Sequence, residues 1–281
     1  MFRSLSPGAI GVGVSSLEEG LELAARHGFE GYHFSIAEAA KLGAERVGEL
    51  VEAKGVRLSA WGLSVNFRAG DSEYQESMAK LPLLARTAAE LGVLRATSGA
   101  APCSDELDFE ENFKLHMERL KPAASILADR GIRLGMEYIA PRTSWTSMKY
   151  PFIHTMEQMS ELCAALGPNV GLLLDSWHWY QAHENTEQLQ QLAPEQVVDV
   201  HVNDAPADVP IDEQQDLVRA LPGETGVIDI AGFLGALVQI GYDGPVMVEP
   251  FSERLRQMPT DEACAATAAA LDKVWEEEAD Q

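Results

Sequence analysis

The sequence predicts an α/β protein folded as a single (β/α)8 barrel over residues 1–281, and three observations predict it. Short apolar segments of the kind that form buried strands alternate with amphipathic helical segments along the chain. A glycine that can cap the preceding helix stands before five of the strands, at Gly28, Gly55, Gly92, Gly131 and Gly241. No shift in composition marks a second domain. Parallel strands joined by helices close most simply into a barrel of about 250 residues.

The predicted elements follow one another from the N-terminus. The first four strands are expected at residues 9–14, 31–35, 56–65 and 93–98, with helices at residues 17–26, 37–53, 73–91 and 108–130. The last four strands are expected at residues 133–136, 170–174, 197–200 and 245–248. Long loops follow the fifth and seventh strands, at residues 140–154 and 205–226. An open doubly wound sheet is the alternative, but no Gly-x-Gly-x-x-Gly motif follows the first strand.

The last four strands each run into an ionisable residue. These residues are, in chain order, Glu137, Asp175, His201 and Glu249. An ionisable group at the end of a buried strand is costly, and the C-terminal ends of barrel strands carry active sites. Taken singly, each has a plainer explanation, such as a hydrogen-bonded core histidine or a carboxylate paired with a basic neighbour. Together they predict one divalent-metal site at the C-terminal rim of the barrel.

The donor set also indicates which ion would bind. A set of three carboxylates and one imidazole suits Mn²⁺, Mg²⁺ or Co²⁺ better than it suits a structural zinc ion. Mn²⁺ is the favoured ion, with Mg²⁺, Co²⁺ or Zn²⁺ as alternatives.

The composition argues against several classes of partner. A formal net charge of −23 repels nucleic acid and anionic lipid, and the sequence has no basic patch to offset it. No apolar run approaches the roughly 18 residues that a membrane span needs, and no hydrophobic signal segment begins the chain. The three cysteines are scattered, which fits a reducing compartment. We therefore expect a cytoplasmic protein without a nucleic-acid or membrane partner.

Four motifs resemble a known family. They are Gly135-Met-Glu137, Leu174-Asp-Ser-Trp-His178, Val200-His-Val-Asn-Asp204 and Val246-Met-Val-Glu-Pro250. Together they resemble the xylose isomerase-like TIM barrels, a superfamily that includes ketose 3-epimerases, inosose isomerases and dehydratases, and endonuclease IV. The resemblance covers essentially the whole chain, and its motifs are specific for the superfamily but not for one substrate. It also makes a homo-oligomer plausible.

The resemblance to the epimerase branch implies roles for the site residues. It implies that Glu137, Asp175, His201 and Glu249 hold one ion, that Glu137 and Glu249 act as the acid–base pair, and that His178 contacts substrate. The chemistry agrees, because removing a proton next to a carbonyl needs a base near the carbon and a cation near the developing enediolate. The expected activity is therefore a metal-dependent isomerase or epimerase acting on a small sugar or polyol ketone.

The chain departs from the ketose 3-epimerases at two substrate contacts. It has Ala207 where they carry an arginine six residues after the metal histidine, and Thr143 where they carry a glutamate six residues after the first ligand. Three basic residues, Arg142, Lys149 and Arg219, are candidates to replace these contacts, with surface charge as the alternative. Two further candidates for substrate contact are His33 and Trp61, at the ends of the second and third strands, with packing as the alternative.

Three other functions remain open. A keto-sugar or inosose dehydratase or lyase shares the first proton abstraction. An endonuclease IV-type phosphodiesterase is less favoured, because it needs three zinc ions and further histidines where this chain has Trp61 and Ser98. A non-catalytic sugar-binding barrel is the third alternative.

Overall fold

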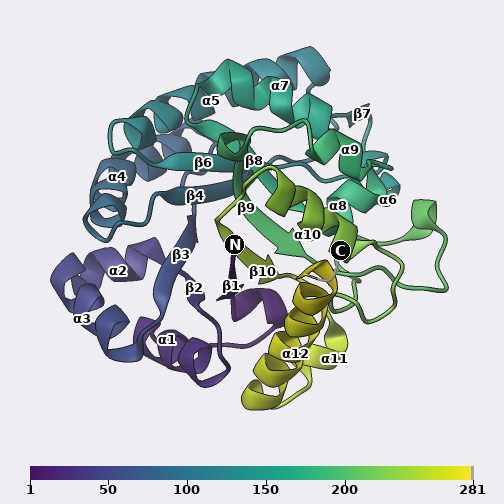
Figure 1. Ribbon diagram of the computed structural model, residues 1–281. Helices are drawn as coiled ribbons and strands as arrows, with labels where there is room; N and C mark the ends of the chain where they lie inside the picture. Colours follow the sequence, from purple (N-terminus) through teal and green to yellow (C-terminus); the bar gives the residue numbers. More distant parts are fainter. Residues whose placement is uncertain (280–281) are drawn as a thin grey trace.

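Eight parallel strands close into a barrel in the computed structural model, which describes residues 1–279 and the side chains of residues 1–275 (Figure 1). The strands are β1 (Phe2–Leu5), β2 (Gly31–Phe34), β3 (Arg57–Gly62), β4 (Arg95–Gly99), β6 (Arg133–Glu137), β8 (Val170–Asp175), β9 (Val197–Val202) and β10 (Pro245–Val248). The sheet closes where β1 pairs with β10. The predicted barrel is confirmed, and residues 280–281 of the predicted domain lie outside the described residues.

Helices surround the strands on the outside of the barrel (Figure 1). The longer ones are α1 (Leu17–Arg26), α2 (Ile36–Leu42), α3 (Ala44–Lys54), α4 (Asp71–Glu90), α5 (Phe109–Ala128), α7 (Met156–Leu166), α10 (Ile230–Gln239) and α12 (Thr260–Ala279). Their spacing of apolar residues explains this position: α1 buries Leu17, Leu21 and Ala24, which share one face of a helix. None of the described helices is long and apolar enough to cross a membrane.

The predicted first strand at residues 9–14 is wrong. The strand is β1 (Phe2–Leu5), and part of the apolar run that follows forms the 3-10 helix η1 (Gly8–Ile10). Pro7 cannot donate a ladder hydrogen bond, and Gly11 has a φ of +78°, so this stretch turns instead of extending. The short strand is stable because it pairs on both sides, with β10 and with β2.

The predicted helix at residues 37–53 is two helices. The break falls at Gly43, which has a φ of +86° and ends α2 before α3 begins. A glycine adopts this left-handed conformation at little cost, so the chain changes direction here.

The strands that end in ionisable residues are neighbours in the sheet. Their order is β10, β9, β8, β6, so four consecutive strands bring their C-terminal ends to one sector of the rim. The register fixes the alignment: Asp175 of β8 lies beside His201 of β9, which lies beside Met247 of β10. The absence of a side chain at Gly135 of β6 lets Val198 of β9 pack close to the β6 backbone, since an added Cβ would lie 3.0 Å from Val198.

The two long loops meet over this sector. The loop after β6 contains α6 (Arg142–Trp145) and β7 (Tyr150–Pro151), which pairs with β5 (Cys103–Ser104). The loop after β9 contains η3 (Ile211–Glu213). The Thr143 hydroxyl donates a hydrogen bond to the Gln214 carbonyl at 2.7 Å, so each loop holds the other.

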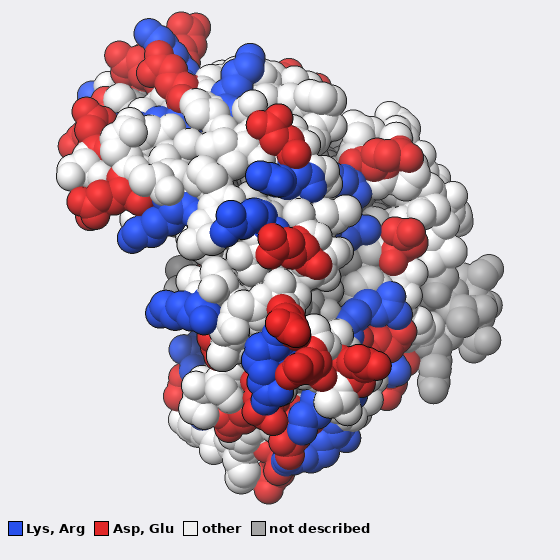
Figure 2. Space-filling model, turned by 90° about the vertical axis from the view of Figure 1, so that its left-hand side faces the viewer, with Lys and Arg blue, Asp and Glu red and all other residues white. Residues whose placement is uncertain are grey.

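Charge is mixed on the surface drawn in Figure 2. Lys and Arg side chains lie among Asp and Glu side chains there and do not form one basic patch. That face therefore offers no concentrated positive field for a nucleic-acid backbone.

Candidate metal centre and active site

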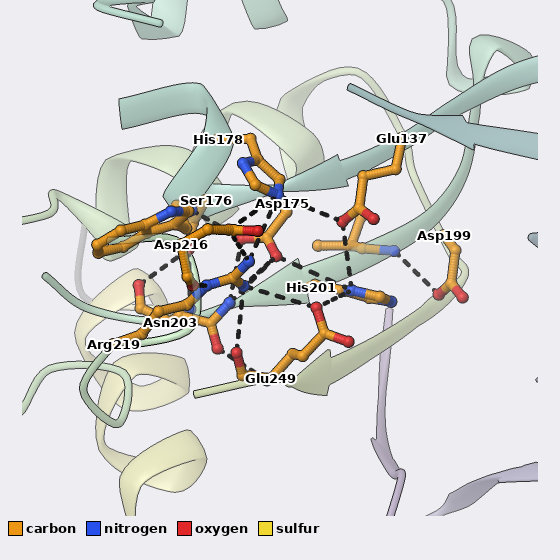
Figure 3. Close-up of polar contacts among 12 residues, drawn as sticks. Glu137, Asp175, Ser176, His178, Asp199, His201, Asn203, Asp216, Arg219 and Glu249 are labelled. Carbon is orange, nitrogen blue, oxygen red and sulfur yellow. Dashed lines mark hydrogen bonds and ion pairs between the residues drawn. The ribbon is translucent and has the colours of Figure 1, made fainter. Parts of the chain in front are cut away.

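Four side chains converge at the C-terminal rim (Figure 3). Glu137, Asp175, His201 and Glu249 each offer one ligand atom, and these atoms all lie within 4.8 Å of one another. Three carboxylate oxygens face Nδ1 of His201. They are Glu249 Oε2 at 3.4 Å, Glu137 Oε1 at 3.8 Å and Asp175 Oδ2 at 3.9 Å.

The spacing and the unpaired atoms fit a divalent ion. Ligands about 2.0–2.2 Å from an ion lie about 3–4.4 Å from one another, which matches the distances to His201. Glu137 Oε1 and both ring nitrogens of His201 are buried without a hydrogen-bond partner within the described residues. Buried polar atoms are normally satisfied, so these atoms mark a place where a ligand belongs. The cluster can thus hold a divalent metal ion.

The four groups perturb one another strongly. Burial and the nearby Glu249 carboxylate raise the pKa of Glu137 well above its usual value. Burial opposes the charged forms of both His201 and Glu249, yet the attraction between the two groups outweighs the effect of burial. This attraction raises the pKa of His201 to about 10 and lowers the pKa of Glu249. The protein chain therefore concentrates negative charge around one imidazole.

Arg219 enters the same cluster from the loop after β9. Its Nη1 lies 2.8 Å from Asp175 Oδ2 and 3.5 Å from Glu249 Oε2, and its side chain is 1% exposed. The sequence predicts Arg219 as a replacement substrate contact or a surface charge, whereas the structure places it beside the candidate ligands. The sequence signal is weak, because the residue lies in a long loop with no periodicity.

Other side chains hold Arg219 and Asp175 in place. Arg219 Nη2 donates to Asp216 Oδ1 at 2.8 Å, and its guanidinium carbon lies 5.5 Å from the Trp177 ring centre and 4.8 Å from that of Phe251. Asn203 Nδ2 donates to both oxygens of Asp175, at 3.0 and 3.2 Å. Asp175 is therefore oriented by an amide and a cation as well as by its strand.

His178 lies one helical turn after Asp175, in α8 (Ser176–Gln181). Its Nδ1 accepts a hydrogen bond from the Ala140 backbone N–H at 3.3 Å, which leaves the ring proton on Nε2. Nε2 lies 3.4 Å from Arg219 Nη2, 3.8 Å from Glu137 Oε1 and 3.9 Å from Asp216 Oδ1. Burial, with the nearby Arg219 cation, holds the pKa of His178 well below its usual value, so the ring is a neutral donor.

The remaining predicted contacts differ in position. His33 of β2 is half-buried, and burial together with the His201 charge lowers its pKa to about 4. Trp61 of β3 is fully buried, and its Nε1 finds no hydrogen-bond partner among the described residues. Arg142 is exposed and pairs with Asp212 at 3.0 Å, and Lys149 lies against the Tyr150 ring, so neither contacts the four ligands.

A model of the xylose isomerase-like TIM barrel matches residues 21–275 of the sequence. The chain belongs to this family. Among members of the xylose isomerase-like family, the inosose isomerase of Bacillus velezensis is 26% identical over 279 residues, 94% of this chain and 95% of that protein. The 3-dehydroshikimate dehydratase of Pseudomonas aeruginosa is 34% identical over 143 residues, 50% of this chain but 21% of that protein.

Solved structures agree with this family. A xylose isomerase domain protein from Alicyclobacillus acidocaldarius is 30% identical, with a TM-score of 0.87 and 99% of each chain covered. The IOLI protein, solved with a bound zinc atom, shares the fold, with 23% identity, a TM-score of 0.81 and 99% of each chain covered.

Proposed function

We propose that this protein is a divalent-metal-dependent isomerase or epimerase of a small sugar or polyol ketone. One observation carries the proposal: the carboxylates of Glu137 and Glu249 reach the same cluster from β6 and β10, the two ends of the four-strand sector. Carboxylates arriving from opposite sides can remove a proton from one face of a substrate and return one to the other. The full-length similarity to an inosose isomerase supports this class of reaction.

The residues of the chain divide the work in this proposal. Each of the two glutamates has two oxygens, so one oxygen can bind the ion while the other faces the substrate carbon. Glu137 or Glu249, as a carboxylate, removes the proton next to the carbonyl and keeps it. The other, protonated, carboxyl group donates its own proton to the opposite face, and both groups then regain their starting states by exchange with solvent. When bound, a divalent ion supplies the positive charge that stabilises the negative charge developing on the substrate oxygens.

His178 completes the proposed site. Its Nε2–H faces the cluster. The nearest polar atom, Arg219 Nη2 at 3.4 Å, cannot accept a hydrogen bond, so the Nε2–H can donate to a substrate oxygen. The ion that we expect is Mn²⁺. Because the IOLI protein binds a zinc atom, zinc is to be tested beside Mn²⁺, Mg²⁺ and Co²⁺.

Solvent exchange tests the proposal directly. The metal-loaded protein is incubated in D₂O with a panel of ketoses, ketose phosphates, inososes and keto acids, and deuterium is located by NMR. We expect deuterium at a carbon next to the carbonyl of at least one compound, and an isomerised or epimerised product. A panel that gains no deuterium would contradict the proposal and favour the phosphodiesterase or the non-catalytic sugar-binding barrel.

A dehydratase is the second candidate. It is favoured by the 34% identity to a 3-dehydroshikimate dehydratase over half of this chain. Proton removal would then be followed by loss of a hydroxyl group from the next carbon instead of return of the proton. The product is a conjugated ketone, so the appearance of its ultraviolet absorbance with loss of water would replace the first proposal with this one.

A further inference from the structure

A cavity of about 560 Å³ opens beside the metal centre. It lies between the ends of β4 and β6 and the loop that carries α6, and its lining includes Arg68, Ser98, Gly99, Ser144 and Asp216. A second cavity, of about 500 Å³, lies along the loop after β3 and shares Arg68 and Ser98 with the first. Arg68 thus contributes its side chain to both spaces above the rim.

Gly99 lies between Arg68 and the proposed catalytic carboxylate of Glu137. Arg68 Nη1 donates a hydrogen bond to the Gly99 carbonyl at 3.5 Å. Gly99 ends β4, pairs in register with Glu137, and is so close that an added Cβ would lie 3.5 Å from Glu137 Oε2. A small substrate whose reacting carbon lies at Glu137 can therefore extend past Gly99 to the guanidinium.

The Arg68 guanidinium has no carboxylate partner among the described residues. Among the described residues no carboxylate lies within ion-pair distance of it, although the chain has 44 acidic residues and 21 basic ones. The two acids that line the cavities do not pair with it either. Asp216 pairs with Arg219 at 2.8 Å, and Glu73 makes no ion pair with Arg68.

The Arg68 side chain is exposed to solvent at the cavities, where a ligand can reach it. Its guanidinium carbon lies 5.3 Å from the centre of the Phe67 ring, and partial burial lowers the pKa of the side chain, with no acid to offset it. Arg119, which reaches the same loop, instead pairs with Asp71 at 2.6 Å. The hydroxyls of Ser98 and Ser144, which line the cavity, have no hydrogen-bond partner within the described residues.

We propose that Arg68 is a specificity residue that binds an anionic group, a carboxylate or a phosphate, on the ketone substrate. Arginine suits both anions because its planar fork of donors matches their oxygens. The hydroxyls of Ser98 and Ser144 supply further donors in the same cavity. This inference rests on the proposed function for the position of the reacting carbon, at Glu137. It restricts the substrate class to keto acids or keto phosphates.

Calorimetric titration of matched ligands tests the inference. The carboxylate arm compares 3-dehydroshikimate with an uncharged inosose, and the phosphate arm compares fructose 6-phosphate with fructose. Each is titrated into the metal-loaded wild type, Arg68→Gln, Arg68→Lys and Arg46→Gln. The last variant removes an exposed arginine of α3 that pairs with Glu49 and does not line either cavity, so it controls for net charge. Thermal unfolding of each variant checks that it folds.

We expect the wild type to bind one anionic ligand more tightly than its uncharged partner. Arg68→Gln should weaken that binding roughly 10- to 100-fold, the usual worth of a hydrogen bond to a charged group, and change uncharged binding less than about twofold. Arg68→Lys should retain part of the preference, and Arg46→Gln all of it. The arm that responds identifies the carboxylate or the phosphate.

Three results would overturn the inference: no binding of either anion, equal binding of charged and uncharged partners, or equal weakening of both in Arg68→Gln. The deuterium exchange test separates these failures from failure of the proposed function. If deuterium enters an inosose equally well in the wild type and in Arg68→Gln, and neither protein prefers anions, the proposed isomerase stands and the role of Arg68 is refuted. If anion binding depends on Arg68 but no compound exchanges deuterium, the role of Arg68 stands and the proposed isomerase is refuted.

Discussion

Arg219 and Asp175 form an ion pair inside the cluster of candidate metal ligands. Their Nη1 and Oδ2 atoms are 2.8 Å apart, and the two side chains are 1% and 0% exposed. The pair joins the loop after β9 to the end of β8 (Figure 3). A cation from a loop thus offsets part of the negative charge that four strand ends bring together.

Removing this cation should destabilise the metal-free protein. Arg219→Met leaves the buried Asp175 and the half-buried Asp216 without this partner, and losing one member of a buried pair costs about 3–5 kcal/mol of the free energy of unfolding. Added Mn²⁺ should restore part of the loss, because it brings positive charge back to Asp175. Denaturant unfolding with and without Mn²⁺ measures both effects.

Arg142→Met is the matched control. Arg142 and Asp212 lie 3.0 Å apart but are 59% and 53% exposed, so their separation should cost about 1 kcal/mol or less. Equal losses in the two variants would show that the buried pair does not stabilise the fold.

The second prediction concerns the metal ligands. The double variant Asp175→Ala/His201→Ala removes two of the four donors, so the purified protein should no longer hold a stoichiometric divalent ion. Elemental analysis after dialysis measures the ion content. Asp212→Ala, which removes an exposed carboxylate from the loop after β9, should retain the ion. A full equivalent of metal in the double variant would show that other residues bind the ion.

The third prediction concerns Glu137 and Glu249. Glutamine keeps the shape and one oxygen ligand but cannot act as a base, so each variant should lose roughly 10²- to 10⁴-fold in rate. Each should also fail to exchange the proton on its own face of the substrate. Rates and deuterium incorporation are to be measured at full metal occupancy. Near wild-type exchange in both variants would show that these residues only hold metal.

The fourth prediction concerns His178, whose Nε2–H we assign to a substrate oxygen. His178→Asn removes that donor at the cluster without removing any of the four proposed ligands. It should retain the ion and lose turnover. Elemental analysis beside activity distinguishes the two roles: loss of the ion would make His178 a ligand and would favour a multinuclear, phosphodiesterase-like centre.

The fifth prediction concerns Glu184, which accepts hydrogen bonds from the Tyr138 hydroxyl at 2.6 Å and the Met156 N–H at 2.7 Å. Burial raises its pKa from 4.5 to about 7. The folded protein therefore holds this proton more tightly than the unfolded chain does. The resulting stability is fully present below about pH 4.5 and is lost as the pH rises through 7. A shift of this size amounts to about 3 kcal/mol.

Glu184→Gln tests this pH dependence. The free energy of unfolding of the wild type, relative to that of the variant, should fall between pH 4.5 and 7 and then level off. Urea unfolding across this range provides the measurement, and Glu187→Gln is the control for removing an exposed carboxylate from the same segment. Parallel pH profiles for wild type and Glu184→Gln would refute the assignment.

Local sequence was sufficient for the barrel and for the four clustered carboxylate and imidazole groups. A buried parallel strand needs an apolar run, and the ionisable groups of the site come where such runs end. Glu137 and Asp175 end their strands, His201 is one residue from the end of β9 and Glu249 follows β10, and parallel strands align those ends. The first strand escaped prediction because Phe2–Leu5 is short, and its stability comes from β2 and β10, far away in sequence.

Only the tertiary structure decided which cations serve the site. Arg142, Lys149 and Arg219 look alike in the sequence, since loop residues follow no period that would reveal their burial. Arg219 is buried because acids from two strands, Asp175 and Glu249, surround it, whereas Arg142 and Lys149 lie on the surface. Arg68 contacts the Gly99 carbonyl, and the sheet register places Gly99 next to Glu137. Such placements depend on packing between distant segments, which short-range sequence patterns do not encode.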